Sequence, residues 1–299
     1  MDLSAITDII IAGIVRGGLF VMMALGLSII FGVMNIPNFA HGEFYMIGAY
    51  CAYYANAVYG LNPIVSIALA GMGGFAVGAL IEKTAFTALR KKSVGNWVMN
   101  SFLLTAGLSI MLQNLAQAIM GVRYMGIRNY WEGNINILPS VSISIDRFAA
   151  FIIAMVTVVF FWAFLHKTKT GNSIRAVSED ENGAMLVGIN LNKVHTLTFS
   201  LGAMLAAIAG AALLSINPAY PTIGLAPLYK SWYVVILVGM GNIWGTIIGG
   251  FLVGLIEAFS YYNLGAGWQD VVSLVIIMLI LALKPSGLFG KSVKGVWDR

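Results

Sequence analysis

The strongest constraint on how this chain folds is a series of long apolar stretches that recurs along almost its whole length. A helix that crosses about 30 Å of hydrocarbon needs roughly 20 predominantly apolar residues. Such stretches lie at residues 6–32, 39–59, 62–89, 97–120, 148–166, 194–216, 229–241, 245–262 and 268–284. The seventh and eighth are short or interrupted by glycine, so we predict a polytopic bundle of about 8–9 transmembrane helices, some of them broken.

Composition favours a membrane protein over a soluble one. Of the 299 residues, 59% are hydrophobic and 10% are charged, and the mean hydropathy is +0.87. Soluble domains carry about 25% charged residues, and exposed apolar surface on this scale would drive aggregation. We therefore expect one all-α integral membrane domain over residues 1–299. The start has an acid at Asp2 and no basic segment, so we expect a retained first span and not a cleaved signal peptide.

The basic residues predict how the spans are oriented. Eleven of the seventeen fall in one alternating set of loops, at Arg90, Lys91, Lys92, Lys167, Lys169, Arg175, Lys193, Lys284, Lys291, Lys294 and Arg299. The other set holds Arg123, Arg128 and Arg147, with Lys230 at the edge of a span. Because cytoplasmic loops carry the excess of lysine and arginine, we predict an N-terminus outside, a cytoplasmic C-terminus and nine spans. The net charge of +5 then needs no nucleic-acid partner to explain it.

The segment FGVMNIPNFAHGEF, residues 31–44, places polar side chains between two apolar runs. Proline lacks a backbone donor and disfavours helix in the residue before it, so Pro37 predicts a broken helix. Irregular backbone at membrane depth is tolerated where it is buried in protein or lines a cavity, and transporters often bind solutes at broken helices. We predict a substrate path or gate here, formed by Asn35, Asn38, His41 and Glu43. The alternative is a cytoplasmic turn in which Asn38 caps the next helix and Glu43 lies in its first turn.

Glycines at four-residue spacing predict close helix packing, because small residues let helix backbones approach one another in lipid. The pairs are Gly13/Gly17, Gly74/Gly78, Gly245/Gly249 and Gly250/Gly254. A second break is predicted at VGMGNIWGTIIGG, residues 238–250, whose GNI echoes the MNI of residues 34–36. The echo is a weak indication of an internal repeat.

The sequence offers no pattern for enzyme chemistry or metal binding. His41, His166 and His195 lie in different segments, without the spacing of metal ligands. Between residues 194 and 283 the only acids are Glu257 and Asp270, and neither has an evident acid–base partner. We expect no catalytic residue, no metal and no cofactor in this chain.

Three of the twelve acids crowd into one run, Glu179 to Glu181, within residues 167–193. By the predicted topology these residues form the longest cytoplasmic loop. Asn172 or Ser173 as a cap, and Gly188 as a stop, predict a helix between them.

One face of this predicted helix is apolar and another is acidic. The apolar face comprises Ile174, Val177, Ala184 and Met185, and Glu179 and Asp180 project from the other. A helix of this kind, lying across the end of the bundle, could insert into a groove on a partner, with apolar anchors and a charged rim. The alternative is a solvated helix that only joins two spans.

The loop sequence GNSIRAVSEDENGAMLVGINLNKV, residues 171–194, resembles the ATPase-docking loop of permeases in the branched-chain amino-acid ABC importer family. The shared pattern comprises Gly171, Arg175-Ala176, Glu179-Asp180, Ala184, and Leu186 to Asn190. The family's NFAHGE is matched at 38–43, its glycine-rich GxIxGxxIGG at Gly241 to Gly250, and its PxGLFG-like ending at 285–290. The resemblance extends over essentially the whole length in the same order. The chain departs from the family at two positions. Pro37 lies in a run that is usually rich in glycine and methionine, and Trp244 stands where the family commonly has proline.

This resemblance implies a transmembrane subunit of an ATP-driven uptake system in the bacterial inner membrane. It implies pairing with a homologous second permease, docking of two cytoplasmic ATPases on the loops, and delivery of solute by a periplasmic or extracellular binding protein. Closure of the ATPases would push on residues 172–188 and switch the bundle between two states. Arg175, Glu179 and Asp180 would be docking contacts, and Gly188 would end the docking helix.

Two other functions stay open on the sequence. A passive channel for a small neutral solute would fit the glycine packing, the NPA of residues 217–219 and the scarcity of charge. A proton-coupled carrier would make Glu43 and His41 a relay. The cargo also stays open between branched-chain amino acids and the urea, short amides and aromatic or alicyclic acids that the wider family handles.

Overall fold

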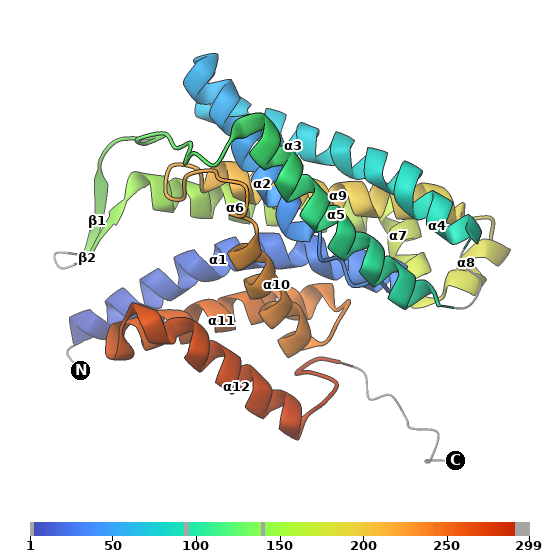
Figure 1. Ribbon diagram of the computed structural model, residues 1–299. Coiled ribbons are helices and arrows are strands. Elements are labelled where there is room, and N and C mark those ends of the chain that lie inside the picture. Colours follow the sequence, from blue (N-terminus) through green and yellow to red (C-terminus); the bar gives the residue numbers. More distant parts are fainter. Residues whose placement is uncertain (1–2, 93–95, 139–140, 291–299) are drawn as a thin grey trace.

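The computed structural model describes residues 3–92, 96–138 and 141–290, which form a bundle of helices with one two-stranded β-hairpin at its end (Figure 1). Within these residues, seven helical segments are long and apolar enough to cross a membrane. They comprise α1 (Leu3–Met34), α3 (Pro63–Ile81) with η2 (Glu82–Phe86) and α4 (Thr87–Lys92), α5 (Trp97–Met120), α6 (Ile145–Lys167), α9 (Leu191–Ala212), α11 (Ile243–Leu264), and η3 (Ala266–Trp268) with α12 (Gln269–Leu283). The predicted polytopic helical membrane protein is confirmed at this level.

Two of the nine predicted spans are shorter than a membrane crossing. The stretch at 39–59 forms α2 (His41–Tyr53) followed by the π-helical turn η1 (Tyr54–Val58). The stretch at 229–241 forms α10 (Leu225–Val238), only 14 residues long. The stretch at 229–241, predicted to be short, is short, whereas the stretch at 39–59 is helical from His41 to Val58 and is not among the seven candidate spans.

One short β-hairpin, which the sequence analysis did not predict, lies in a loop of the helical bundle. Strand β1 (Asn134–Leu138) pairs antiparallel with β2 (Val141–Ser144). Alternating polar and β-branched residues favour a strand, and both segments alternate in this way. Asp146, at the start of α6, accepts hydrogen bonds from the backbone N–H groups of Tyr130 and Trp131, which ties the preceding loop to this end of the bundle.

The N-terminal ends of the two short helices, α2 and α10, meet inside the bundle. A Cβ added to Gly224, the residue before α10, would lie 1.9 Å from the carbonyl oxygen of Gly42 in the first turn of α2. The Nε2 atom of His41 lies 3.0 Å from the carbonyl oxygen of Met23, far inside α1. Since α1 runs on for 11 residues from Met23 to Met34 at 1.5 Å each, α2 begins about 16 Å back from the end of α1.

The two predicted breaks are observed at residues 35–40 and 239–242, and both lie near the C-terminal end of α1. Gly32, in the last turn of α1, is close enough to Gly241 that an added Cβ would lie 3.2 Å from its Cα. Gly239 and Gly241 have positive φ angles of 99° and 82°, which glycine adopts without strain. The N–H groups of Leu288 and Phe289 donate to the last carbonyls of α10. The family-like ending at 285–290 therefore closes the second break, whereas Lys291, Lys294 and Arg299 lie outside the described residues.

Glycine contacts hold the long helices together, as the four-residue spacing predicts. A Cβ on Gly254 of α11 would lie 2.5 Å from the Cα of Gly17 on α1, and one on Gly250 would lie 3.0 Å from the Cα of Val21. These distances are shorter than real Cβ contacts, so the two backbones touch. The close approach replaces the hydrophobic drive that is absent between helices in lipid.

We predict that Gly254→Ala destabilises the protein by about 1–3 kcal/mol, because the methyl group forces α1 and α11 apart. The midpoint of thermal unfolding in detergent measures this. Gly107→Ala on α5 is the matched control, since nothing lies within 4 Å of its added Cβ. Equal midpoints for the two variants would contradict the packing described.

Candidate functional site

The predicted break in residues 31–44 is present in the structure. Helix α1 ends at Met34, and Asn35 follows with a φ angle of 51°, in the left-handed region. Residues 35–40 are not helical, and α2 starts at His41. Because α2 begins deep in the bundle, this segment doubles back along the last turns of α1. We refer to residues 35–40 as the re-entrant segment.

Three of the four predicted path residues are buried together at the start of α2. Asn38, His41 and Glu43 have no exposed surface, whereas Asn35 is exposed at the end of α1. The side-chain oxygen of Asn38 accepts a hydrogen bond from the N–H of Ala40, 3.1 Å away. Asn38 therefore shapes the turn before α2, although the cap position itself is occupied by Ala40, which makes no side-chain bond.

Helix α5 covers this segment with a row of polar side chains that sequence reasoning missed. The row follows one face at four-residue spacing: Ser101, Thr105, Ser109 and Gln113. Ser109 Oγ and Gln113 Nε2 each donate to Glu43 Oε1 at 2.8 Å. Thr105 donates to the carbonyl oxygen of Pro37 at 3.2 Å. We call these four residues, with Asn38, His41 and Glu43, the polar seam.

Several polar atoms in the polar seam have no hydrogen-bond partner among the described residues. They are Asn38 Nδ2, His41 Nδ1, Glu43 Oε2 and Ser101 Oγ. An unmet buried donor or acceptor costs about 1–3 kcal/mol, so native proteins rarely keep several in one place without a use for them. The polar seam therefore keeps several buried donors and an acceptor unpaired among the described residues.

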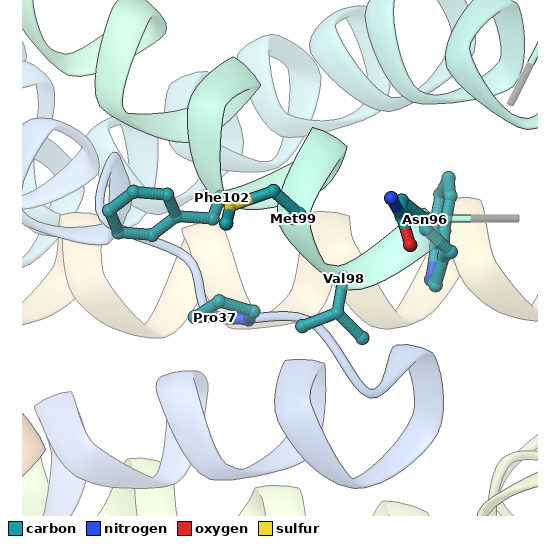
Figure 2. A pocket seen from close by; sticks show the side chains of 6 residues that line it. Pro37, Asn96, Val98, Met99 and Phe102 are labelled. Atoms are coloured by element: carbon teal, nitrogen blue, oxygen red, sulfur yellow. The ribbon is translucent and has the colours of Figure 1, made fainter.

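A cavity of about 530 Å³ opens beside the re-entrant segment, where α5 begins (Figure 2). Its lining is Pro37, Asn96, Trp97, Val98, Met99 and Phe102. Phe102 also packs edge-on against Phe39, at 5.1 Å between ring centroids, and Phe39 packs on Trp232 of α10 at 5.5 Å. A row of aromatic rings from three elements thus runs from the edge of this cavity to α10.

The loop at 167–193 contains two short helices, α7 (Lys169–Glu179) and α8 (Glu181–Leu186), and not the single helix predicted over 172–188. Thr168 caps α7, in place of Asn172 or Ser173. The helix is interrupted at Asp180, which has an extended backbone. Its side chain accepts a hydrogen bond from Asn182 N at 3.0 Å. Asp180 is thus an N-cap residue of α8. Gly188 follows α8 with a φ angle of 83°, as a helix stop requires.

The break at Asp180 changes which apolar side chains are buried. Ile174, Val177 and Ala184 are buried, but Met185 is 48% exposed, because α8 starts with a new orientation. Leu186 is 89% exposed and Val187 is 76% exposed. Glu179 and Asp180 are exposed, and the guanidinium group of Arg175 donates to Asn172 on its own helix at 2.7 Å. We call Met185 to Val187 the apolar tip of the loop.

The acids Glu257 and Asp270 do have a partner, contrary to the sequence-based prediction. Lys230 of α10 forms ion pairs with both. Arg16 of α1 donates to Gln269 at 3.0 Å, next to Asp270. Sequence reasoning missed the cluster because its members lie on four helices that are distant in the sequence. Among the described residues no group of histidine, cysteine and acidic side chains could hold a metal ion.

Long apolar helices, two half-length helices that start at the centre and a polar seam beside them define a polytopic helical transport protein. Comparison with known families narrows this class. Residues 9–281 match the family described as "Branched-chain amino acid transport system / permease component". The chain belongs to this family, whose members are transport subunits and not enzymes. The resemblance seen in the sequence motifs is confirmed.

Curated relatives agree over nearly the full length. The chain is 32% identical over 289 residues to LivH, the high-affinity branched-chain amino acid transport system permease protein of Escherichia coli K12, which covers 93% of this chain and 94% of LivH. It is 30% identical over 295 residues to BraD of Pseudomonas aeruginosa, with 94% and 95% covered. A part of the chain is 31% identical over 133 residues to the ribose import permease protein RbsC of Bacillus subtilis, 42% and 41% of the two chains. No solved structure matches the chain.

We predict that Gln113→Leu destabilises the protein by about 1–3 kcal/mol, because it leaves Glu43 buried with one donor fewer. Thermal unfolding in detergent measures the loss. Asn114→Leu is the matched control on the next residue, where the exposed side chain bonds only to its own helix at Ile110. A larger effect at residue 114 than at residue 113 would refute the role given to the polar seam.

Proposed function

We propose that this protein is the transmembrane permease subunit of an ATP-binding-cassette importer that moves a branched-chain amino acid, or a closely related small organic solute, into the cytoplasm. Membership of the family and the names of the full-length relatives support the class of cargo. The single structural observation that carries the proposal is the re-entrant segment, held at membrane depth by the polar stripe of α5.

The polar seam is the proposed path. Asn38, His41 and Glu43 would meet the polar end of the solute, and Asn35 would lie at the mouth of the path. The aromatic rings of Phe39 and Phe102 suit an apolar side chain. Helix α5 is the least apolar of the seven spans. Even so, only 11% of its most apolar 18 residues are buried within this chain, against 78% for α1. A helix of this kind suits a face covered by a second permease better than a face covered by lipid.

The membrane placement follows from the two half-length helices. With residues 35–58 as one crossing and residues 213–238 as another, the seven long helices become nine crossings. Figure 1 shows the N-terminal end and the β-hairpin at one end of the bundle, and α7, α8 and the end of α4 at the other. The positive-inside bias then puts the N-terminus outside and the C-terminus in the cytoplasm of a bacterial inner membrane.

Residues 167–193 are the proposed coupling loop, within a single domain of 1–299. Its apolar tip, flanked by Glu179 and Asp180, suits a groove on a partner ATPase. We expect Arg175 and Gly188 to act by holding the shape of the loop. The complete importer would contain a homologous second permease, two cytoplasmic ATPases, and a periplasmic or extracellular solute-binding protein. No nucleic acid is involved.

We predict that Leu186→Asp abolishes ATPase binding and uptake while the chain still inserts and folds, because Leu186 is 89% exposed. Co-purification of the ATPase and uptake into vesicles measure this. Val122→Asp is the control, since Val122 is 68% exposed and lies just after the C-terminal end of α5.

Glu179→Lys should weaken docking in the same way. Asp180→Asn should bind better than Asp180→Ala, because asparagine also caps a helix.

A purified chain in vesicles should transport no solute by itself and should gain ATP-dependent uptake when the ATPases and the binding protein are added. A passive channel or a proton-coupled carrier would instead work alone. Full uptake by this chain without any ATPase would overturn the proposed function.

A further inference from the structure

Glu82 is a fully buried acid that the polar seam and the coupling loop do not use. It is the first residue of the π-helical turn η2, between α3 and α4. One of its oxygens forms an ion pair with Arg90 of α4, and the other accepts a hydrogen bond from the Thr196 hydroxyl of α9. Acids inside a membrane span are costly and usually functional, and π-helical turns often mark functional sites.

On one side these contacts lead to the coupling loop. His195, beside Thr196 near the start of α9, places Nε2 3.9 Å from Glu181 Oε1 in the first turn of α8. Helix α9 begins at Leu191, within the last residues of the loop, and the side-chain oxygen of Asn190 caps it by accepting a hydrogen bond from Lys193 N at 3.1 Å. The residue that approaches α8 and the residue that bonds Glu82 are therefore neighbours in the chain, at His195 and Thr196.

On the other side the contacts lead to the re-entrant segment. The Arg90 guanidinium lies over the Trp97 ring at 5.9 Å from its centroid. The indole N–H of Trp97 donates to the carbonyl oxygen of Met34 at 3.2 Å. Met34 is the last residue of α1, directly before the left-handed Asn35, and Trp97 also lines the cavity beside Pro37.

We propose that the Glu82–Arg90 ion pair is a positioning element that transmits movement of the coupling loop to the re-entrant segment through Trp97. This inference rests on the proposed function, and it assigns a role in coupling to residues outside the docking surface and outside the path. Removing one partner of a buried ion pair leaves an uncompensated charge, so the two side chains are held to each other. The pair therefore links α4, α5 and α9 as one body at the end where the loop lies.

The chain contains a matched control for this pair. Lys230 and Glu257 form a second buried ion pair, with side chains 12% and 3% exposed against 18% and 0% for Arg90 and Glu82. It joins α10 to α11, and Asp270 extends it to the start of α12, near the turn at the opposite end of the bundle (Figure 1). Loss of this pair disturbs packing without touching the route from the loop to Met34.

The experiment uses the complete importer in vesicles and measures solute uptake and ATP hydrolysis in the same preparation. We expect Glu82→Gln to raise the ATP consumed per solute by roughly tenfold, within the usual range of coupling between sites. Glu257→Gln should lower uptake and ATP hydrolysis together and leave that ratio unchanged. A ratio for Glu82→Gln equal to that of the unmodified protein would overturn the inference.

Trp97→Phe keeps a ring under Arg90 but removes the N–H that binds Met34, so it tests the route if Glu82→Gln does not fold. It should raise the same ratio, and the double variant should raise it no further than the larger single effect, because both changes interrupt one route. A normal ratio in Trp97→Phe, or additive effects, would overturn the inference. Failure of the proposed function would look different, because the unmodified importer would then show no ATP-dependent uptake.

Discussion

The structure depends on one constraint, which is that no backbone N–H or C=O group can be left without a partner inside a lipid bilayer. Each unmet group there costs several kcal/mol, yet this chain leaves its helices at residues 35–40 and 239–242. Asn38 and Thr105 supply partners within the first segment, and Trp97 bonds the last carbonyl of α1 before it. At the second segment, the N–H groups of Leu288 and Phe289 bond the last carbonyls of α10. Both breaks therefore depend on contacts with residues distant in the sequence.

This dependence explains the unusual composition of α5. A span that only faced lipid would gain nothing from serine, threonine and glutamine at every fourth position, but α5 uses them to satisfy Glu43 and Pro37. Few of its other residues are buried, so its attachment to the bundle is largely this polar face. Hydrogen bonds between membrane helices are of modest strength. The element that covers the proposed path is therefore also one that can shift at modest energetic cost.

The sequence predicted most of the helices well because membrane spans leave a strong signal in hydropathy. The bounds predicted at 97–120 coincide with those of α5, and the break around Pro37 was visible as polar residues between apolar runs. The start of α2 and α10 against each other inside the bundle was not predictable in this way, since hydropathy gives the composition of a segment and not its depth. The polar stripe of α5 and the β-hairpin were readable from their periodicity and were missed.

The site was harder to predict than the fold because its contacts join distant segments. The polar character of Asn38, His41 and Glu43 pointed to a buried role, but their partners on α5 lie about 70 residues further along the chain, beyond the reach of spacing rules. The partners of Lys230 were missed for the same reason, as its two acids lie on two later helices. In the coupling loop, the acid that looked like a docking contact, Asp180, also ends one helix and caps the next.

The meeting of α2 and α10 at Gly42 and Gly224 has an electrostatic consequence. Each helix start carries a partial positive charge of roughly half an elementary unit, so two such poles face each other at mid-membrane. Glu43 is the one acid in either first turn, and its bonded oxygen is turned towards α5. Paired positive poles repel bare cations, as they do in water-selective pores. The contact between the two helix starts therefore favours neutral or anionic groups over bare cations in its immediate surroundings.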